Sequence, residues 1–148
     1  MDRALVVAEP TEAATELAQM AGSLAEAGDA TVVLIHATTD EEYAARKQAM
    51  SSIASSGGTY TTDDAREGAR QFAQDLAEAE LSEFDIEYET AGYVGEKADA
   101  ILEAADDHDC DHVYLPGRER SPTGKALFGD ATQRVLLEFD GPVTVLTE

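Results

Sequence analysis

Cysteine, lysine and long hydrophobic runs are all scarce in this sequence, and each shortage excludes a class of protein. The single cysteine, Cys110, cannot form an internal disulfide, which agrees with a reducing compartment. No run approaches the ~20 apolar residues that a membrane-spanning helix needs, and residues 1–10 lack the basic head and apolar stretch of a signal peptide. We therefore expect a cytoplasmic protein with no membrane partner.

Positive charge is scarce as well. The chain has 10 Lys and Arg residues against 31 Asp and Glu residues, a formal net charge of -21. Such a surface repels phosphates, so we expect no nucleic-acid partner. An acidic surface poor in lysine also suits a halophilic cytoplasm, because the Debye length falls to ~3 Å at ~1 M salt and self-repulsion is then screened. The charge indicates habitat and solubility more than activity.

The first 36 residues carry an alternation of short apolar runs and a helical stripe. A continuous apolar run at residues 4–8 predicts a strand covered on both faces. Helical spacing follows as far as Leu24, with Thr11 as the N-cap and Gly28 as the C-terminal stop. A second buried run at residues 31–36 completes a β-α-β unit, whose crossover is right-handed in almost all proteins.

The middle of the chain is less regular. Residues 40–50 favour a short helix, whereas residues 51–62 are small, polar and glycine-bearing, which predicts a mobile loop. Asp64 with Glu67 is an acceptable helix start. From residue 84 to residue 89, apolar and acidic residues alternate, which predicts an edge strand with one wet face. That strand would carry the apolar side chains Phe84, Ile86 and Tyr88.

The last third returns to clear alternation. A helical stripe runs from Ala98 to Ala105 and includes Leu102. A short strand at residues 112–115 and a strand at residues 143–147 flank a last helix, whose apolar face carries Val135, Leu136 and Phe139. With 43% hydrophobic residues, the 148-residue chain can bury a core, and we expect residues 1–148 to form a single domain.

Strands that alternate with helices predict an α/β fold with an open parallel sheet and helices on both faces. Ligands of such sheets bind beyond the carboxyl ends of the strands, where the winding reverses. If the first and fourth strands are neighbours, Glu9 and Pro10 face Pro116 and Gly117 across that crevice.

A basic, glycine-bearing loop connects the fourth strand to the last helix. Backbone N–H groups and the positive end of a helix make this arrangement suited to phosphates. The loop is not a Walker A motif, because six residues separate Gly117 from Gly124 and Ala126 follows Lys125. The sequence does not show whether residues 118–128 are ordered. The candidate anion-binding residues of the loop are Arg118, Arg120, Gly124, Lys125 and Gly129.

Together with the whole β-α alternation, this loop resembles that of the universal stress protein family. The family pattern is a glycine, two residues, a second glycine, nine residues, then Gly-Ser or Gly-Thr at the start of the last helix. Gly117, Gly129 and Thr132 carry the resemblance, together with the closing 142–146 strand. The resemblance implies a Rossmann-like open five-stranded parallel sheet of order 3-2-1-4-5. In nucleotide-binding members the loop wraps the phosphates of ATP, and the ends of the first two strands hold ribose and adenine.

The sequence departs from the family's binding pattern at four places. Arg120 stands where the second glycine belongs, and the interval from Arg120 to Gly129 is one residue short. Asp130 replaces the Ser or Thr, and Glu9 stands near the first-strand aspartate that binds ribose. We expect the Asp130 carboxylate to cap the helix itself and to oppose a phosphate, since unit charges ~4 Å apart repel by ~4 kcal/mol at a dielectric near 20. Arg134 and the loop cations could offset this charge.

The resulting candidate site combines the ends of three strands with the last helix. The resemblance implies ATP or AMP as the cofactor. The site itself would be either a retained nucleotide site or a degenerate anion site. The residues that we expect around a nucleotide or anion are Glu9, Pro10, Ala37, Pro116, Gly117, Arg118, Arg120, Gly124, Lys125, Gly129, Asp130, Ala131 and Thr132.

Two histidine features and the last strand bear on metal binding, catalysis and assembly. His108 and His112 are four residues apart, as in some zinc sites, but they should straddle a helix end and a strand start, so we expect no metal site. His36 ends a buried strand and is interpreted as a hydrogen-bonded core residue and not as a catalytic base.

The uncharged last strand is an open edge. The resemblance implies a homodimer that pairs this strand across a two-fold axis, through Val143, Thr144, Val145 and Leu146.

Three functional hypotheses follow. The first is a non-enzymatic, homodimeric stress-response protein whose nucleotide pocket is altered by Arg120 and Asp130. The second is a switch that binds ATP or AMP, with at most slow hydrolysis. The third is a small anion-dependent enzyme, although no catalytic triad or isolated carboxylate pair supports it. The sequence does not name the inducing stress or a downstream partner.

Overall fold

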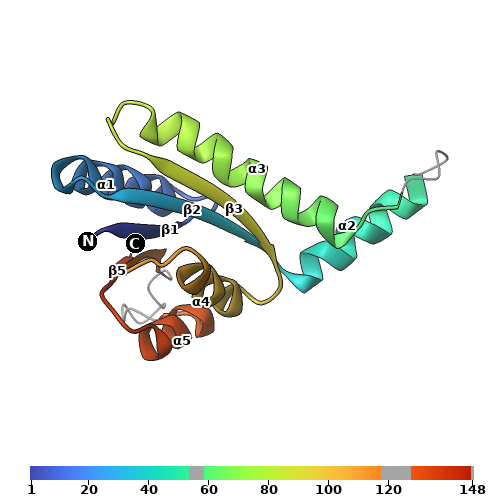
Figure 1. Ribbon diagram of the computed structural model, residues 1–148. Coiled ribbons are helices and arrows are strands. Elements are labelled where there is room, and N and C mark those ends of the chain that lie inside the picture. Colours follow the sequence, from blue (N-terminus) through green and yellow to red (C-terminus); the bar gives the residue numbers. More distant parts are fainter. Residues whose placement is uncertain (54–58, 118–127, 148) are drawn as a thin grey trace.

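The computed structural model describes residues 1–53, 59–117 and 128–147, and its strands form one sheet. All four strand pairings are parallel, and the order is β3-β2-β1-β4-β5, which confirms the predicted α/β topology. Figure 1 shows the arrangement. The elements in chain order are β1 (Arg3–Val7), α1 (Glu12–Gly28), β2 (Thr31–Thr38), α2 (Asp40–Ile53), α3 (Thr62–Leu81), β3 (Tyr88–Val94), α4 (Lys97–Asp107), β4 (His112–Pro116), α5 (Asp130–Glu138) and β5 (Val143–Leu146).

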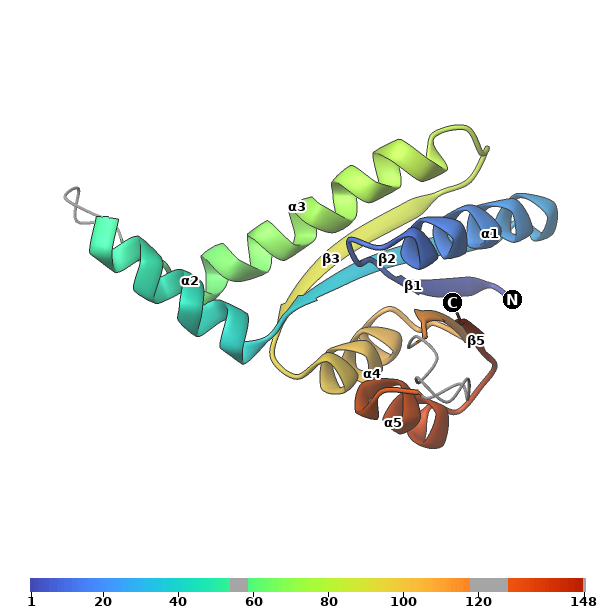
Figure 2. The same ribbon diagram turned by 180° about the vertical axis from the view of Figure 1, so that it is seen from behind.

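The sheet is covered on both faces, which explains the continuous apolar runs of its inner strands. Along β1, Ala4 and Val6 point into a core with α1 and α3, whereas Leu5 and Val7 point into a core with α4 and α5. Successive side chains along each strand therefore point alternately into two separate hydrophobic clusters. Both views of the ribbon show α1 and α3 on one side of the sheet, with α4 and α5 on the other (Figures 1 and 2).

Helix α1 begins as predicted but ends differently. The Thr11 hydroxyl accepts a hydrogen bond from the backbone N–H of Ala14 at 3.2 Å. Gly28 is the last helical residue, and Asp29 adopts the left-handed conformation that ends the helix (φ 55°). Leu24, predicted to lie on the buried face, is 50% exposed, because the packed face passes through Ala21 and Ala25 instead.

Predicted boundaries between residues 51 and 94 were wrong in three places. Helix α2 continues to Ile53, and residues 54–58 lie outside the described residues. Helix α3 starts earlier than Asp64, because Thr61 and Asp64 exchange the two hydrogen bonds of a capping box. Strand β3 begins only at Tyr88, although it does form a sheet edge. The alternation before it arises because Phe84 and Ile86 cover the end of the α1–α3 core.

Helix α2 differs from the other helices because it extends away from the sheet, beyond the end of β2 (Figures 1 and 2). Its described side chains are exposed, apart from the partly buried Tyr43. Val135 of α5 and Phe139, the C-cap of this helix, face the core as predicted, but Leu136 is 40% exposed. No helix among the described residues is long and apolar enough to cross a membrane.

Candidate functional site

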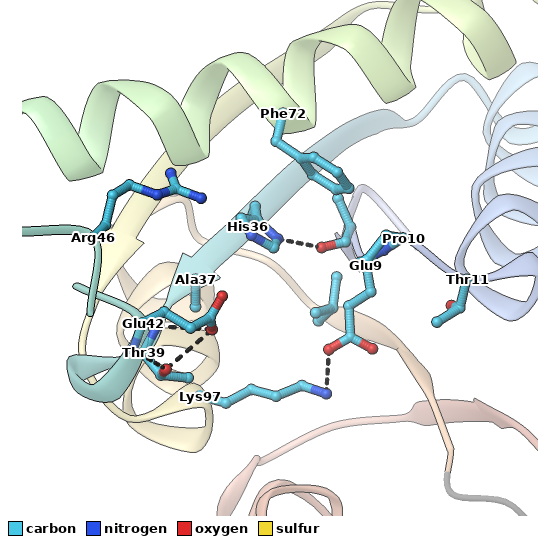
Figure 3. A pocket seen from close by; sticks show the side chains of 12 residues that line it. Glu9, Pro10, Thr11, His36, Ala37, Thr39, Glu42, Arg46, Phe72 and Lys97 are labelled. Carbon is cyan, nitrogen blue, oxygen red and sulfur yellow. Dashed lines mark hydrogen bonds and ion pairs between the residues drawn. The ribbon is translucent and has the colours of Figure 1, made fainter. Parts of the chain in front are cut away.

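A pocket of about 360 Å³ opens at the carboxyl edge of the sheet, by which we mean the edge where the parallel strands end. Its walls come from the ends of β1 and β2, from the residues that follow these strands, and from helices α2, α3 and α4 (Figure 3). Strand β1 lies between β2 and β4, so the winding of the chain reverses beside this pocket. The predicted residues Glu9, Pro10 and Ala37 all line it.

One end of the pocket carries an ion pair. Glu9, two residues beyond the end of β1, pairs through its carboxylate with the ammonium group of Lys97, the first residue of α4. Figure 3 shows the lysine side chain crossing the pocket floor to reach Glu9. Both side chains are about three-quarters buried, at 23% and 28% exposure. Sequence reasoning missed Lys97, although the segments after parallel strands all converge on this edge.

The opposite wall of the pocket is aromatic. A ring nitrogen of His36, Nδ1, lies 2.7 Å from the backbone oxygen of Ala8, which confirms the prediction of a hydrogen-bonded histidine. The His36 ring also packs on Phe72 of α3, with 4.4 Å between ring centroids and 38° between planes. His36 is only partly buried and lines the pocket, so it is not confined to the core.

The start of α2 closes a third side. The Glu42 carboxylate accepts hydrogen bonds from the backbone N–H and the hydroxyl of Thr39, and the Thr39 hydroxyl accepts one from the N–H of Glu42. This reciprocal capping fixes the first turn of α2 at the pocket rim. One helical turn further on, Arg46 also lines the pocket.

The end of β4 meets β5 closely at Gly117. The Gly117 N–H donates to the Leu146 carbonyl at 2.8 Å, and an added Cβ would lie 2.7 Å from Val145 Cγ1. A side chain at this position would collide with the last strand, so packing alone requires glycine here. Pro116 ends β4 beside the end of β1, at the same sheet edge as Glu9. The predicted loop residues Arg118, Arg120, Gly124 and Lys125 lie outside the described residues.

The first turn of α5 is not capped as predicted. Its N-cap is Gly129, which has no side chain, and Asp130 is the first helical residue with an exposed side chain. The prediction that Asp130 caps the helix is therefore wrong, because a capping side chain must come from the residue that precedes the first turn. No side chain in the described part of the chain accepts from the N–H groups of Asp130, Ala131 or Thr132. Thr132 itself is 2% exposed.

Arg134 also differs from expectation, since it does not neutralise Asp130. Its guanidinium contacts Glu138 at 2.7 Å, Asp99 at 2.5 Å and Glu96 at 2.8 Å, and these hydrogen bonds raise its pKa. Two of these carboxylates belong to the N-terminal end of α4. The contacts therefore hold the middle of α5 beside the start of α4, whose Lys97 lies in the pocket.

The residues of the 108–112 segment diverge. His108 lies 3.5 Å from Glu89, whereas the His112 ring contacts the Thr144 hydroxyl at 2.8 Å and stacks on Tyr114. Burial raises the pKa of the Cys110 thiol to about 11. No group of three or more His, Cys, Asp or Glu side chains suited to a metal ion occurs among the described residues.

Comparison with known proteins places this geometry in a family. The model of the universal stress protein family matches residues 1–147. A solved structure described as hypothetical protein MJ0577 is 16% identical with a TM-score of 0.73, and covers 99% of this chain and 96% of its own. No curated protein sequence matches.

Two other similar structures contain nucleotides. A universal stress protein in complex with cAMP is 19% identical (TM-score 0.60, covering 99% of this chain and 96% of its own). A universal stress protein from Archaeoglobus fulgidus in complex with dAMP is 17% identical (TM-score 0.52, covering 98% and 96%). At these identities the likeness establishes the fold.

Proposed function

This chain belongs to the universal stress protein family, and we propose that its carboxyl-edge pocket binds an adenine nucleotide in a non-enzymatic, regulatory role. The observation that carries this proposal is the division of the pocket into a charged end and an aromatic end. Glu9 and Lys97 can meet ribose hydroxyls and a phosphate, while His36 and Phe72 offer a surface for a base. A pocket of about 360 Å³ falls within the range of small-molecule sites, ~300–1,000 Å³.

Two relatives of the same fold support the choice of ligand. Their structures hold cAMP and dAMP, which share an adenine base and a single phosphate. Apart from Arg46, the charged and hydrogen-bonding side chains of the pocket contact one another or the backbone: Glu9 pairs with Lys97, Glu42 with Thr39, and His36 with the Ala8 carbonyl. This commitment supports a binding role over catalysis.

We further propose that Asp130 makes the site prefer a nucleoside monophosphate to ATP. The N–H groups of the first turn of α5 can attract an anion, because no described side chain occupies them. The Asp130 carboxylate stands at the same helix end, and Arg134 is already paired with three other acids. Each further phosphate of a nucleotide would add negative charge close to Asp130, so the penalty grows from AMP to ATP.

Calorimetric titration of nucleotide-free protein with AMP and ATP, at fixed salt, tests both statements. We expect AMP to bind more tightly than ATP, and Asp130→Ser to raise ATP affinity about tenfold while changing AMP affinity less. Glu138→Gln is the matched control, since it removes one negative charge from the same helix away from its N-terminus. Tighter binding of ATP than of AMP by the wild-type protein would show that Asp130 does not alter the pocket.

We also propose a homodimer that forms through the open edge of β5. Gly117 and Val113 donate to the carbonyls of Leu146 and Pro142, so the backbone groups of alternate residues face β4. By the same alternation, the backbone groups of Val143 and Val145 face away from the sheet and are available to a second copy. Closed two-fold pairing is the usual arrangement of soluble oligomers.

The proposed dimer can be broken without disturbing β4. Val145→Pro removes an outward N–H donor, and proline is tolerated on the open side of an edge strand. We expect this variant to be monomeric by light scattering at concentrations where the wild type is dimeric, while Val145→Ala, which keeps the donor, remains dimeric. A dimer of unchanged stability in Val145→Pro would place the interface elsewhere.

A further inference from the structure

Arg46 is the one basic side chain in the described part of the chain that has no partner. Seven of the ten Lys and Arg residues are described. Five of the seven form ion pairs, and Lys47 lies 5.8 Å from the ring centroid of Tyr43. In a chain with 31 acidic residues an unpaired arginine is unexpected, and this one lines the pocket.

The position of Arg46 is set by the local structure of α2. The capping contacts between Thr39 and Glu42 fix the first turn of the helix at the pocket rim, and Arg46 follows one turn later. Figure 3 shows its guanidinium directed over the pocket toward His36 and Phe72. The two rings and the guanidinium therefore border the same end of the cavity.

This end lies away from the anion-binding groups. Lys97 is at the start of α4, and Arg134, in the middle of α5, holds that helix against the same end of α4. A phosphate directed toward Lys97 and α5 leaves the base of the nucleotide to extend in the other direction, toward α2 and α3. Arg46 would then meet the base and not the phosphate.

We propose that Arg46 is the outer wall of a base slot and stacks on the purine ring of the bound nucleotide, opposite His36 and Phe72. This inference rests on the proposed function and adds a specificity-determining residue to it. A planar, weakly hydrated guanidinium stacks well on aromatic faces, whereas an ammonium group does not. A purine offers more stacking area than a pyrimidine, so the slot selects purine nucleotides. Helix α2, whose Glu42 already lines the pocket, would then take part in base recognition through Arg46.

Titration of adenosine and AMP into wild type, Arg46→Gln, Arg46→Lys and Lys47→Gln tests the proposal. We expect Arg46→Gln and Arg46→Lys each to weaken adenosine and AMP equally, by about fivefold, because the lost contact is with the base. Lys47→Gln is the control, since it removes the same charge from the adjacent position of the same exposed helix. It should leave both affinities unchanged. Uridine should bind the wild type more weakly than adenosine and respond less to Arg46→Gln.

Each alternative result overturns the proposal in a distinct way. If Arg46→Gln weakens AMP but not adenosine, and Arg46→Lys restores AMP binding, Arg46 binds phosphate. If Arg46→Gln changes the two affinities no more than Lys47→Gln does, Arg46 makes no specific contact with the ligand. If the wild type binds AMP and either of these two results is found, this inference is wrong, but the proposed function stands. A wild type that binds neither adenosine nor AMP overturns the proposed function and this inference with it. Circular dichroism of each variant confirms that exposed α2 is intact.

Discussion

The two edges of the sheet use similar side chains in opposite ways. At the amino edge, where the strands begin, the Asp111 carboxylate accepts hydrogen bonds from the backbone N–H groups of Asp2 and Arg3, at 2.9 and 3.3 Å. The Arg3 guanidinium donates to the His108 carbonyl at 2.6 Å and to Glu89 at 2.7 Å. These contacts tie β1 to β3 and to the segment between α4 and β4.

At the carboxyl edge, corresponding groups surround an open cavity. Arg46 has no partner in the described part of the chain, and the pair of Glu9 with Lys97 borders the pocket. The first turn of α5, which does not line this pocket, lacks a capping side chain. Charged groups that satisfy one another stabilise the fold, whereas those left facing a cavity are available to a ligand. Substitutions at the two edges should therefore separate stability from binding.

The largest expected effect is on stability, at the amino edge. Arg3→Ala should lower the free energy of unfolding by about 2 kcal/mol, because it leaves the partly buried His108 carbonyl and Glu89 without their donor. AMP affinity should not change. Arg66→Ala, which breaks an exposed pair with Asp63 in α3, should cost less than about 0.5 kcal/mol. Urea denaturation measures both. An equal cost for the two variants would show that the amino edge is not a stabilising cluster.

The matching change at the carboxyl edge should act on binding. Lys97→Ala removes the cation that we propose faces the phosphate and should weaken AMP about tenfold, equivalent to ~1.4 kcal/mol, with a smaller loss for adenosine. Stability should fall by less than about 1 kcal/mol, since Glu9 loses a partner that is partly solvated. Lys97→Arg is the control and should retain most of the affinity. Unchanged AMP binding in Lys97→Ala would remove this residue from the site.

The smallest effect is a pH dependence confined to the amino edge. Burial opposes ionisation of Asp111, but the hydrogen bonds from Asp2 and Arg3 outweigh it and lower its pKa. A carboxyl whose folded pKa lies below its unfolded pKa adds stability above the unfolded value and loses it as pH falls through the folded value. The stability difference between wild type and Asp111→Asn should thus shrink below about pH 4, by about 0.5 kcal/mol. AMP affinity should show no such difference between the two proteins. A difference in stability that is constant with pH would contradict the assignment.

The parts of the fold that could be predicted are those with patterns local in sequence. Residues 4–8 and 31–36 are continuous apolar runs because helices cover both faces, and parallel order follows from the alternation of elements. The pairing of β1 with β4 then placed Glu9 and Pro116 at one edge. The start of β3 was misplaced because Phe84 and Ile86 cover a helix pair with the same period of two that a strand would show.

The parts of the site that could not be predicted from the sequence depend on contacts between distant segments. Lys97 and Arg46 carry no sequence motif, and only the packing of α4 and the capping of α2 bring them to the pocket. The capping role predicted for Asp130 was wrong because the helix starts one residue earlier than expected, so that Gly129 is the N-cap and Asp130 lies in the first turn. Sequence patterns locate helix ends only to within one or two residues. The hydrogen bond of His36 was predicted correctly, but its position in the wall of the cavity was not.

Backbone amide NMR spectra recorded during titration with AMP test the division between the two edges most directly. The account predicts that the amide signals of residues 8, 9, 11, 36–39 and 130–132 shift, while those of Asp2, Arg3 and Asp111 stay in place. Shifts confined to the amino edge, or none at any nucleotide concentration, would contradict the claim that the carboxyl edge is a nucleotide site.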